Sequence, residues 1–293
     1  MMHISAALAC ESWGPLTTLI PLEHRDLTES SGLAISRRTP NVLWTHDDAG
    51  EPNLFRFTLS GEVSKHEVPG AHNRDWEDIA SAGCPGLGDC LYIGDIGAER
   101  SDPQVITVYV ATEPRGEGPA TVVEQWNLSW PGVPRDAESL IVHPCTLDAW
   151  ILTRTNPPEV YKIPAERGRT EVALLPVATL PLDEPLTAAD FSPDGTQIVL
   201  RSLDKAWRLP VSADSNEPSW DAPSLITEGL ASGEAIAWDL DGDLLLTSEG
   251  FPTPLGRMAC SDGQTPTVCQ PKRCGCQTQS LPRSLLSLLR RRP

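Results

Sequence analysis

The sequence is poor in basic residues. Its 293 residues include 23 Lys and Arg against 40 Asp and Glu, so the formal net charge is −17. Binding to nucleic acid or to anionic membrane surfaces requires Lys and Arg that face phosphates. We therefore expect no nucleic-acid partner.

Long apolar runs and common catalytic motifs are also missing. The chain has no run of 18 or more apolar residues, so we expect no transmembrane segment. It has no Gly-rich phosphate loop, no nucleophile elbow and no His-Glu-x-x-His helix. Turn-forming residues, in contrast, are abundant, with 28 Pro and 22 Gly. This composition is typical of many short strands joined by turns, and it predicts an all-β fold.

An internal repeat defines the fold more closely. Five similar segments begin at Ser31, Glu77, Glu138, Ala189 and Glu234, and their starts lie 46, 61, 51 and 45 residues apart. Each segment is followed by a second and a third apolar run, with turns such as SPDG and DLDGD between the first two runs. Repeats of this length and content predict the blades of a β-propeller.

We predict five blades within residues 15–260, and six blades stay open as the alternative. A strand-like segment, PLTTLIPLEH, precedes the first repeat, and the fifth repeat lacks a convincing fourth strand. If the N-terminal strand completes the last blade, both exposed edges disappear. We therefore expect this strand to close the ring.

The two ends of the chain differ in character. Residues 1–14 have the small residues of a secretory signal or a lipoprotein cleavage box without a basic start, so a signal remnant and a plain tail both stay open. Residues 261–293 contain cysteines and six Lys or Arg but only one acid, and from residue 263 onward there is none. Residues 1–262 therefore carry about −23. We predict that this basic tail is disordered.

Cysteine placement indicates the compartment. Cys84 and Cys90 flank the turn-rich PGLGD, so a small loop disulfide is favoured over two free thiols. Cys260 and Cys269 could close a second such loop. Disulfides of this kind indicate an oxidising, extracytoplasmic location.

The ordered motifs ESSGLAIS, VLWTHDDAG, RDWEDIA, LYIGDIG, RDAESLIVHP, FSPDG, EAIAWDLDG and LLLTSEG cover residues 27 to about 258. In this order they resemble an uncharacterised family of bacterial, mostly exported β-propeller proteins. More distantly, the chain is similar to NHL-repeat, TolB-like and gluconolactonase-type propellers. The resemblance implies fold and export but no established catalytic residues. Relatives tend to have GDIGDN where this chain has Ala98 and Glu99 after GDIG.

The first strand of each propeller blade lines the central channel, so polar residues at the repeat starts should converge. These residues are Glu29, Arg74, Asp75, Glu77, Arg135, Asp136, Glu138 and Glu234. Acids that recur blade by blade can accept backbone N–H groups of the neighbouring blade and pair with arginine. We favour such an inter-blade clasp for this set over a ligand site, because structural ion-pair networks mimic functional clusters.

A second set lies at the ends of the second strands and departs from the repeat. Asp47, Asp48, Asp95 and Glu249 are candidate calcium ligands, and His46 is the candidate general base. Turn-forming roles are the alternative for His46, Asp47, Asp48 and Asp95. Arg154 and Arg201 complete the predicted channel mouth.

Two functions remain open from the sequence. The first is an exported, monomeric module that binds a small ligand or a protein at the channel mouth. The alternative is a calcium-dependent hydrolase of the lactonase, phosphotriesterase or phytase-like type, in which the ion acts as a Lewis acid. The sequence does not decide whether the chain is an enzyme.

Overall fold

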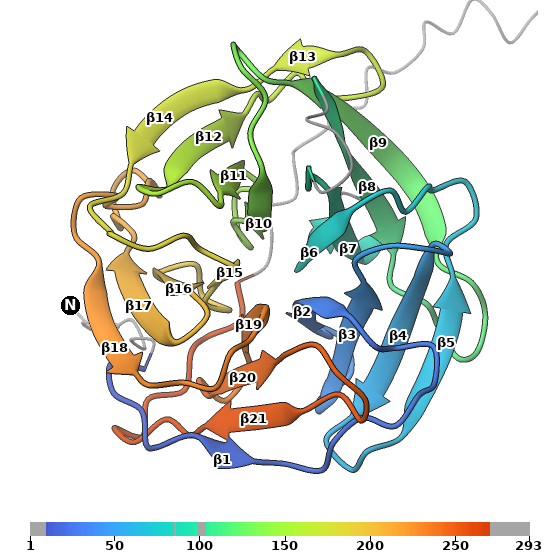
Figure 1. The fold of residues 1–293 in the computed structure, drawn as a ribbon, viewed down its shortest axis with the longest axis vertical. Coiled ribbons are helices and arrows are strands. Elements are labelled where there is room, and N and C mark those ends of the chain that lie inside the picture. Colours follow the sequence, from blue (N-terminus) through green and yellow to red (C-terminus); the bar gives the residue numbers. More distant parts are fainter. Residues whose placement is uncertain (1–9, 85, 99–103, 270–293) are drawn as a thin grey trace, which may run out of the picture.

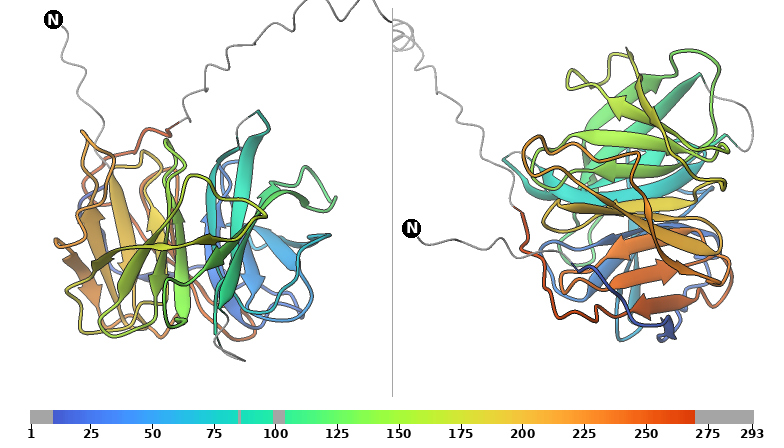
Figure 2. Two further views of the ribbon diagram at one scale, coloured as in Figure 1. Left: turned by 90° about the horizontal axis from the view of Figure 1, so that it is seen from above. Right: turned by 90° about the vertical axis from the view of Figure 1, so that its left-hand side faces the viewer.

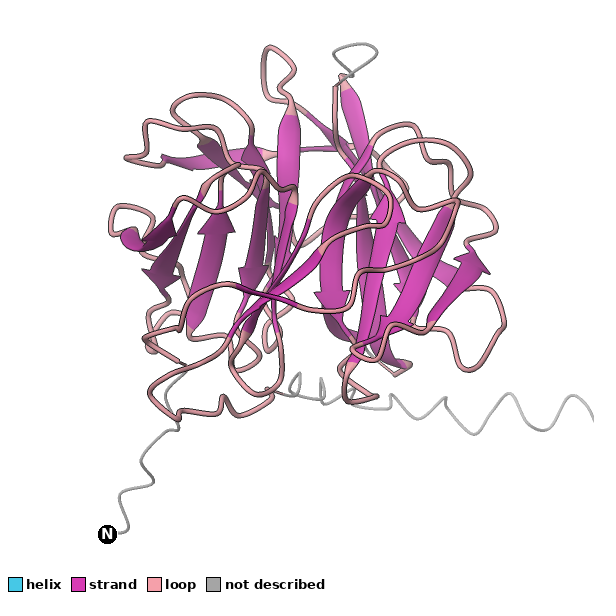
Figure 3. Cartoon of the chain, turned by 60° about the horizontal axis from the view of Figure 1, so that its bottom comes forward, coloured by secondary structure: helices cyan, strands magenta, loops and turns pink. Residues whose placement is uncertain are grey.

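The structure is a computed structural model that describes residues 10–84, 86–98 and 104–269. These residues form strands, turns and loops without a helix, as Figure 3 shows. The strands make five sheets arranged around one axis (Figure 1). The prediction of an all-β propeller with five blades is confirmed, and the described residues form no sixth blade.

Each blade is an antiparallel sheet whose first strand lies nearest the axis. Blade 1 contains β2 (Ser30–Ile35), β3 (Val42–Asp47), β4 (Asn53–Thr58) and β5 (Val63–Glu67). Blade 2 contains β6 (Trp76–Cys84), β7 (Gly88–Asp95), β8 (Val105–Thr112) and β9 (Thr121–Ser129), with β13 (Val172–Ala173) added parallel to β9. Blade 3 contains β10 (Ala137–Val142), β11 (Ala149–Thr153), β12 (Glu159–Ile163) and β14 (Leu175–Thr179).

The remaining two blades complete the ring. Blade 4 contains β15 (Ala188–Phe191), β16 (Gln197–Arg201), β17 (Lys205–Pro210) and β18 (Ser224–Glu228). Blade 5 contains β19 (Ala235–Trp238), β20 (Leu244–Thr247), β21 (Leu255–Met258) and β1 (Thr17–Thr18).

The N-terminal strand closes the ring, as the sequence predicted. In β1, Thr17 pairs with Arg257 and Thr18 with Gly256 of β21. Backbone bonds from Gly14 to the carbonyl of Ala259 and from Leu19 to that of Leu255 extend the pairing. The N-terminal strand therefore completes the last blade. The pairing leaves neither β1 nor β21 with an unpaired edge toward the other.

The hydrophobic core is divided into five clusters, one at each interface between neighbouring blades. Between blades 1 and 2, for example, Trp44 and Leu54 pack with Trp76 and Tyr109. Both faces of each blade are thus buried, which explains the near-continuous apolar runs in the first and second strands. Full burial of a large apolar side chain stabilises the fold by about 1.5–3 kcal/mol, so the blades hold each other in place.

The ring has two faces, which Figure 2 shows from the side. The mouth face carries the starts of the five inner strands, and the hairpin face carries the turns that join the inner strands to the second strands. No helix formed by the described residues is long and apolar enough to span a membrane.

Candidate functional site

A cluster of three carboxylates lies on the mouth face. Glu77 belongs to β6 of blade 2, whereas Asp136 precedes β10 of blade 3 and Glu138 lies within it. One carboxylate oxygen from each lies within 4.8 Å of the others. We call these three residues the carboxylate mouth. They come from the two repeat starts whose sequences, RDWEDIA and RDAESLI, are most alike.

Crowding of like charges makes this cluster electrostatically unfavourable. Burial raises the pKa of Glu77, and the negative charges of Glu138, Asp75, Asp136 and Asp48 raise it further. The pKa of Glu138 is also raised by burial, although the Arg154 guanidinium opposes that change. A nearby cation would relieve the repulsion in both cases.

The three carboxylates differ in their partners. Glu138 accepts a hydrogen bond from Arg154 at 2.6 Å, and Asp136 accepts one from the backbone N–H of Ala98 at 3.0 Å. The Glu77 side chain makes no hydrogen bond or ion pair with any other residue that the structure describes. Across the mouth, Glu234 of blade 5 interacts electrostatically with Arg154 of blade 3. Among the described residues, the negative charge of Glu77 is therefore the least compensated of the three, and a bound cation would stabilise it most.

The predicted clasp residues do not all bridge blades. Arg74 lies 3.6 Å from a carboxylate oxygen of Asp95, and both belong to blade 2. The N–H of Asp75 donates to the same Asp95 carboxylate at 2.9 Å. Arg135 pairs with Glu159 at 2.8 Å within blade 3. These pairs fix the start of an inner strand to its own blade.

The backbone of Glu29 is fixed in the same way within blade 1. Its N–H donates to the Asp47 carboxylate at 2.9 Å, and its carbonyl accepts the N–H of Asp48 at 3.2 Å.

Carboxylates that do bridge blades lie deeper, one residue after the positions that the sequence singled out. Asp78 in β6 accepts the N–H of Leu140 in β10 at 2.9 Å. Asp190 in β15 accepts the N–H of Trp238 in β19 at 2.9 Å. Burial raises the pKa of both, that of Asp190 to about 7. The signal in the sequence was an acid inside an apolar strand at the same repeat position in blades 2 and 4.

Replacement of Asp78 should separate hydrogen bonding from packing. We expect D78A to lower the free energy of unfolding by about 3 kcal/mol, because the buried N–H of Leu140 loses its acceptor. D78N keeps one acceptor oxygen for the two N–H groups, of Ile79 and Leu140, that Asp78 accepts, so it should lose less, about 2 kcal/mol. Urea unfolding of the two variants measures the difference. Equal losses would show that the inter-blade bond contributes little.

Two of the predicted calcium ligands have structural partners instead. The Asp47 carboxylate accepts the N–H groups of Thr28 and Glu29, both at 2.9 Å. In the next blade, the Asp95 carboxylate likewise accepts the N–H of Asp75. Neither belongs to the carboxylate mouth. Both hold the chain that leads into an inner strand.

The other two predicted ligands lie at the edge of the mouth. Asp48 is close enough to raise the pKa of Glu77, and its backbone carbonyl accepts the N–H of Trp76. Glu249 is exposed, and its charge raises the pKa of Glu234. The metal-binding geometry is found at Glu77, Asp136 and Glu138, for which the sequence favoured the clasp.

His46 lies behind the channel wall, between blades 1 and 2. Its ring is fully buried and meets Trp76 edge to face at 5.6 Å. Its Nδ1 lies 3.1 Å from the carbonyl oxygen of Asp47. A Cβ on Gly32 would come within 2.6 Å of Nε2, which explains the glycine at that position.

The buried imidazole gives stability a defined pH dependence. Burial lowers the pKa of His46 to about 4, against about 6.5 in an unfolded chain. As pH falls from 6.5 to 4, the unfolded chain binds a proton that the folded chain does not, so the free energy of unfolding falls by about 3 kcal/mol. Urea unfolding of the wild type and of H46N at pH 7 and pH 4.5 measures this contribution. The wild type should lose more than H46N, and equal losses would contradict the assignment.

Arg201 ties blade 4 to blade 5. Its guanidinium donates to the carbonyls of Ala235 at 2.7 Å and of Ala231 at 3.0 Å, and the residue is only 3% exposed. Burial lowers its pKa to about 10. Of the two predicted mouth arginines, Arg154 reaches the carboxylate mouth, whereas Arg201 is buried against backbone carbonyls that lead into and follow the strands of blade 5.

Three disulfides are present among the described residues. Cys84–Cys90 closes the small loop in blade 2, and Cys10–Cys260 joins the two parts of the chain in blade 5. The third is Cys145–Cys269, so the expected Cys260–Cys269 pair is wrong. Closure of the ring brings Cys10 to Cys260, and the crossing of residues 261–269 over to blade 3 brings Cys269 to Cys145. Local spacing shows neither approach.

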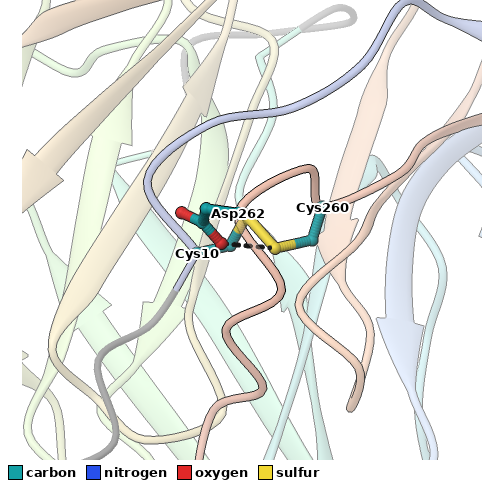
Figure 4. A group of neighbouring side chains, drawn as sticks. All are labelled: Cys10, Cys260 and Asp262. Carbon is teal, nitrogen blue, oxygen red and sulfur yellow. Dashed lines mark hydrogen bonds between the residues drawn. A yellow bond between two sulfur atoms is a disulfide. The ribbon is translucent and has the colours of Figure 1, made fainter.

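A second group with metal-binding geometry contains Cys10, Cys260 and Asp262. Figure 4 shows that the two sulfurs are bonded to each other, so neither is available as a thiolate ligand. The tail cysteines beyond residue 269 and the signal-like residues 1–9 lie outside the described residues.

Comparisons with known proteins support the fold. No protein-family model and no curated protein sequence matches the chain. A putative oxidoreductase (glucose dehydrogenase) from Thermus thermophilus has a similar structure, with a TM-score of 0.51 and 11% identity over 84% of this chain and 99% of that one. An auxiliary nutrient binding protein from Bacteroides thetaiotaomicron gives a TM-score of 0.47 and 12% identity over 87% and 68%. The likeness to the first of these structures shows the fold alone.

Proposed function

We propose that this chain is an exported, monomeric binding module that holds a divalent cation, calcium in the first place, at the carboxylate mouth. The observation that supports this proposal is the approach of Glu77, Asp136 and Glu138 within 4.8 Å. Calcium takes six to eight oxygen ligands from carboxylates, backbone carbonyls and water. Three carboxylates supply up to six oxygens, and their crowding favours a cation over an empty cluster.

A bound cation would also determine which small ligands can bind at the carboxylate mouth. Calcium coordinated from one side by protein oxygens keeps positions for water or for oxygens of a ligand. Arg154 stands beside the cluster, 2.6 Å from Glu138. A small ligand that carries a carboxylate or vicinal hydroxyls would therefore fit the mouth, with the ion and this guanidinium as its partners.

The binding role is better supported than the hydrolase alternative. That alternative used His46 as general base, and a general base must reach the proton that it removes, directly or through one water. The His46 ring is fully buried between two blades. A β-propeller fold does not by itself imply a hydrolase activity.

Export is proposed on two grounds. The motif order resembles that of exported bacterial propellers, and three disulfides fit an oxidising compartment.

Thermal unfolding in the presence of calcium tests the proposal. A ligand that binds only the native state stabilises it by about 2.7 kcal/mol at a concentration of 100 times Kd. For a chain of this size we expect the melting temperature to rise by about 5–10 °C. Magnesium, which demands a smaller octahedral site, should shift it less. No change with excess calcium would contradict the proposal.

A further inference from the structure

Residues 261–269, here called the strap, leave blade 5 and cross the hairpin face. At its start, Cys260 is bonded to Cys10, and at its end Cys269 is bonded to Cys145 in the turn after β10. The N–H of Cys269 donates to the carbonyl of Pro193 in blade 4 at 2.9 Å. The strap thus runs from blade 5 past blade 4 to blade 3, with a disulfide at each end.

Arg37 reaches the strap from the opposite side of the ring. It follows β2 of blade 1, and its side chain is only 3% exposed. The guanidinium lies 3.6 Å from the Asp89 carboxylate of blade 2 and donates to the carbonyl oxygen of Cys269. Because blades 1 and 3 are not neighbours, this contact crosses the axis of the propeller.

Little space remains on the axis beside Arg37. A cavity of about 10 Å³ is lined by residues of all five blades, among them Ala34, Ser81, Val142, Asp190 and Trp238. This volume holds about one water molecule. The Ser81 hydroxyl and Arg37 Nε are buried there without a hydrogen-bond partner among the described residues. The hairpin end of the channel is closed.

Side-chain hydrogen bonds hold the strap mainly at its start, where Asp262 accepts the N–H of Glu11 and the hydroxyls of Ser12 and Ser261 are bonded to each other. Ser261 to Thr265 and Thr267 are exposed, and Pro266 is its one buried residue. Two of its backbone N–H groups donate to the rest of the protein. That of Ser261 donates to the carbonyl of Ser12, and that of Cys269 donates to the carbonyl of Pro193. Segments with few buried contacts open at low free-energy cost. The Cys145–Cys269 bond is therefore the strongest restraint on the end that meets Arg37.

We infer that the strap and Arg37 form a disulfide-held plug, which leaves the carboxylate mouth as the route into the channel until the Cys145–Cys269 bond is reduced. The consequence for ligand access rests on the proposed function, whereas the plug does not. A dithiol reductant would open it by thiol–disulfide exchange. A thiolate of the reductant attacks one sulfur and displaces the other cysteine as a thiolate. The second thiol then displaces the first cysteine, and two electrons pass from the dithiol, which becomes a cyclic disulfide.

Arginine labelling tests the plug without any ligand. C145S/C269S removes the bond while Cys10–Cys260 still tethers the start of the strap. Phenylglyoxal modification followed by peptide mass spectrometry reports Arg37 and Arg201 separately, and both are 3% exposed or less in the intact fold. We expect Arg37 to react at least about tenfold faster in the variant, as a segment freed for local opening would allow. Arg201 should stay protected.

Two results would overturn the inference. If Arg37 reacts no faster in C145S/C269S, the disulfide does not hold the plug. If Arg37 and Arg201 become reactive together, the bond supports the whole fold rather than the strap. Neither labelling result depends on whether calcium binds at the mouth.

Discussion

Replacing Cys10 and Cys260 with serine is expected to lower the free energy of unfolding by about 5 kcal/mol. The two residues are separated by 250 positions, so their bond closes almost the whole described chain into one loop. The chain-entropy model gives a cost that grows with the logarithm of loop length. The same bond fixes the N-terminal segment beside blade 5, where β1 supplies the outermost strand.

The Cys84–Cys90 bond provides the matched control. It spans only six positions, and its loss should cost about 2 kcal/mol by the same relation. Urea unfolding of C10S/C260S and C84S/C90S under one set of conditions shows which variant loses more free energy of unfolding. If the short loop contributed as much as the long one, closure of the ring would not be the source of the stabilisation.

Replacing Glu77 with glutamine should weaken calcium binding by about 100-fold, since affinity for calcium depends on the number of charged ligands. Glu77 is the member of the carboxylate mouth whose side chain has no hydrogen-bond partner among the described residues, so the substitution removes a charged ligand and breaks no hydrogen bond of that part of the chain. Burial and four neighbouring acids favour the neutral form of Glu77 without a cation. The calcium-free E77Q protein should therefore melt within about 2 °C of the wild type.

Isothermal titration with calcium measures this change, and E171Q is the matched control. Glu171 is exposed and far along the chain from the mouth, in the segment before β13. Its replacement removes the same charge and should leave the affinity unchanged. Equal weakening in E77Q and E171Q would mean that the protein attracts calcium through its net charge rather than at this cluster.

The architecture could be predicted because it depends on patterns that repeat along the chain. Five blades bury similar strands in similar places, so SGLAIS at Ser31 and EAIAWD at Glu234 retain the same apolar spacing. The closing strand followed from a physical requirement, the removal of two exposed edges. Both predictions needed only the order of elements, which the sequence contains.

The roles of individual acids were harder to predict because similar local sequences place them differently. Asp47 and Asp95 each end a second strand, and their side chains turn back to nearby backbone N–H groups. Glu77 and Glu138 begin inner strands and point toward each other across two blades. Whether an acid meets its own backbone or another blade depends on tertiary distance, which spacing does not give.

Long-range disulfide pairing could not be predicted either, because it also depends on tertiary distance. Cys145 and Cys269 are 124 positions apart, and their approach requires the strap to cross the hairpin face. Local spacing identified Cys84–Cys90, since six positions and a turn-rich loop suffice for it.

A crystal structure of the protein soaked in calcium, recorded with anomalous scattering, tests the central proposal most directly. We predict one anomalous peak bounded by the carboxylates of Glu77, Asp136 and Glu138, with metal–oxygen distances of about 2.3–2.6 Å. The same peak should be missing from E77Q crystals and present in E171Q crystals. A peak beside Asp47 and Asp95 instead, or none at the carboxylate mouth under saturating calcium, would contradict the account.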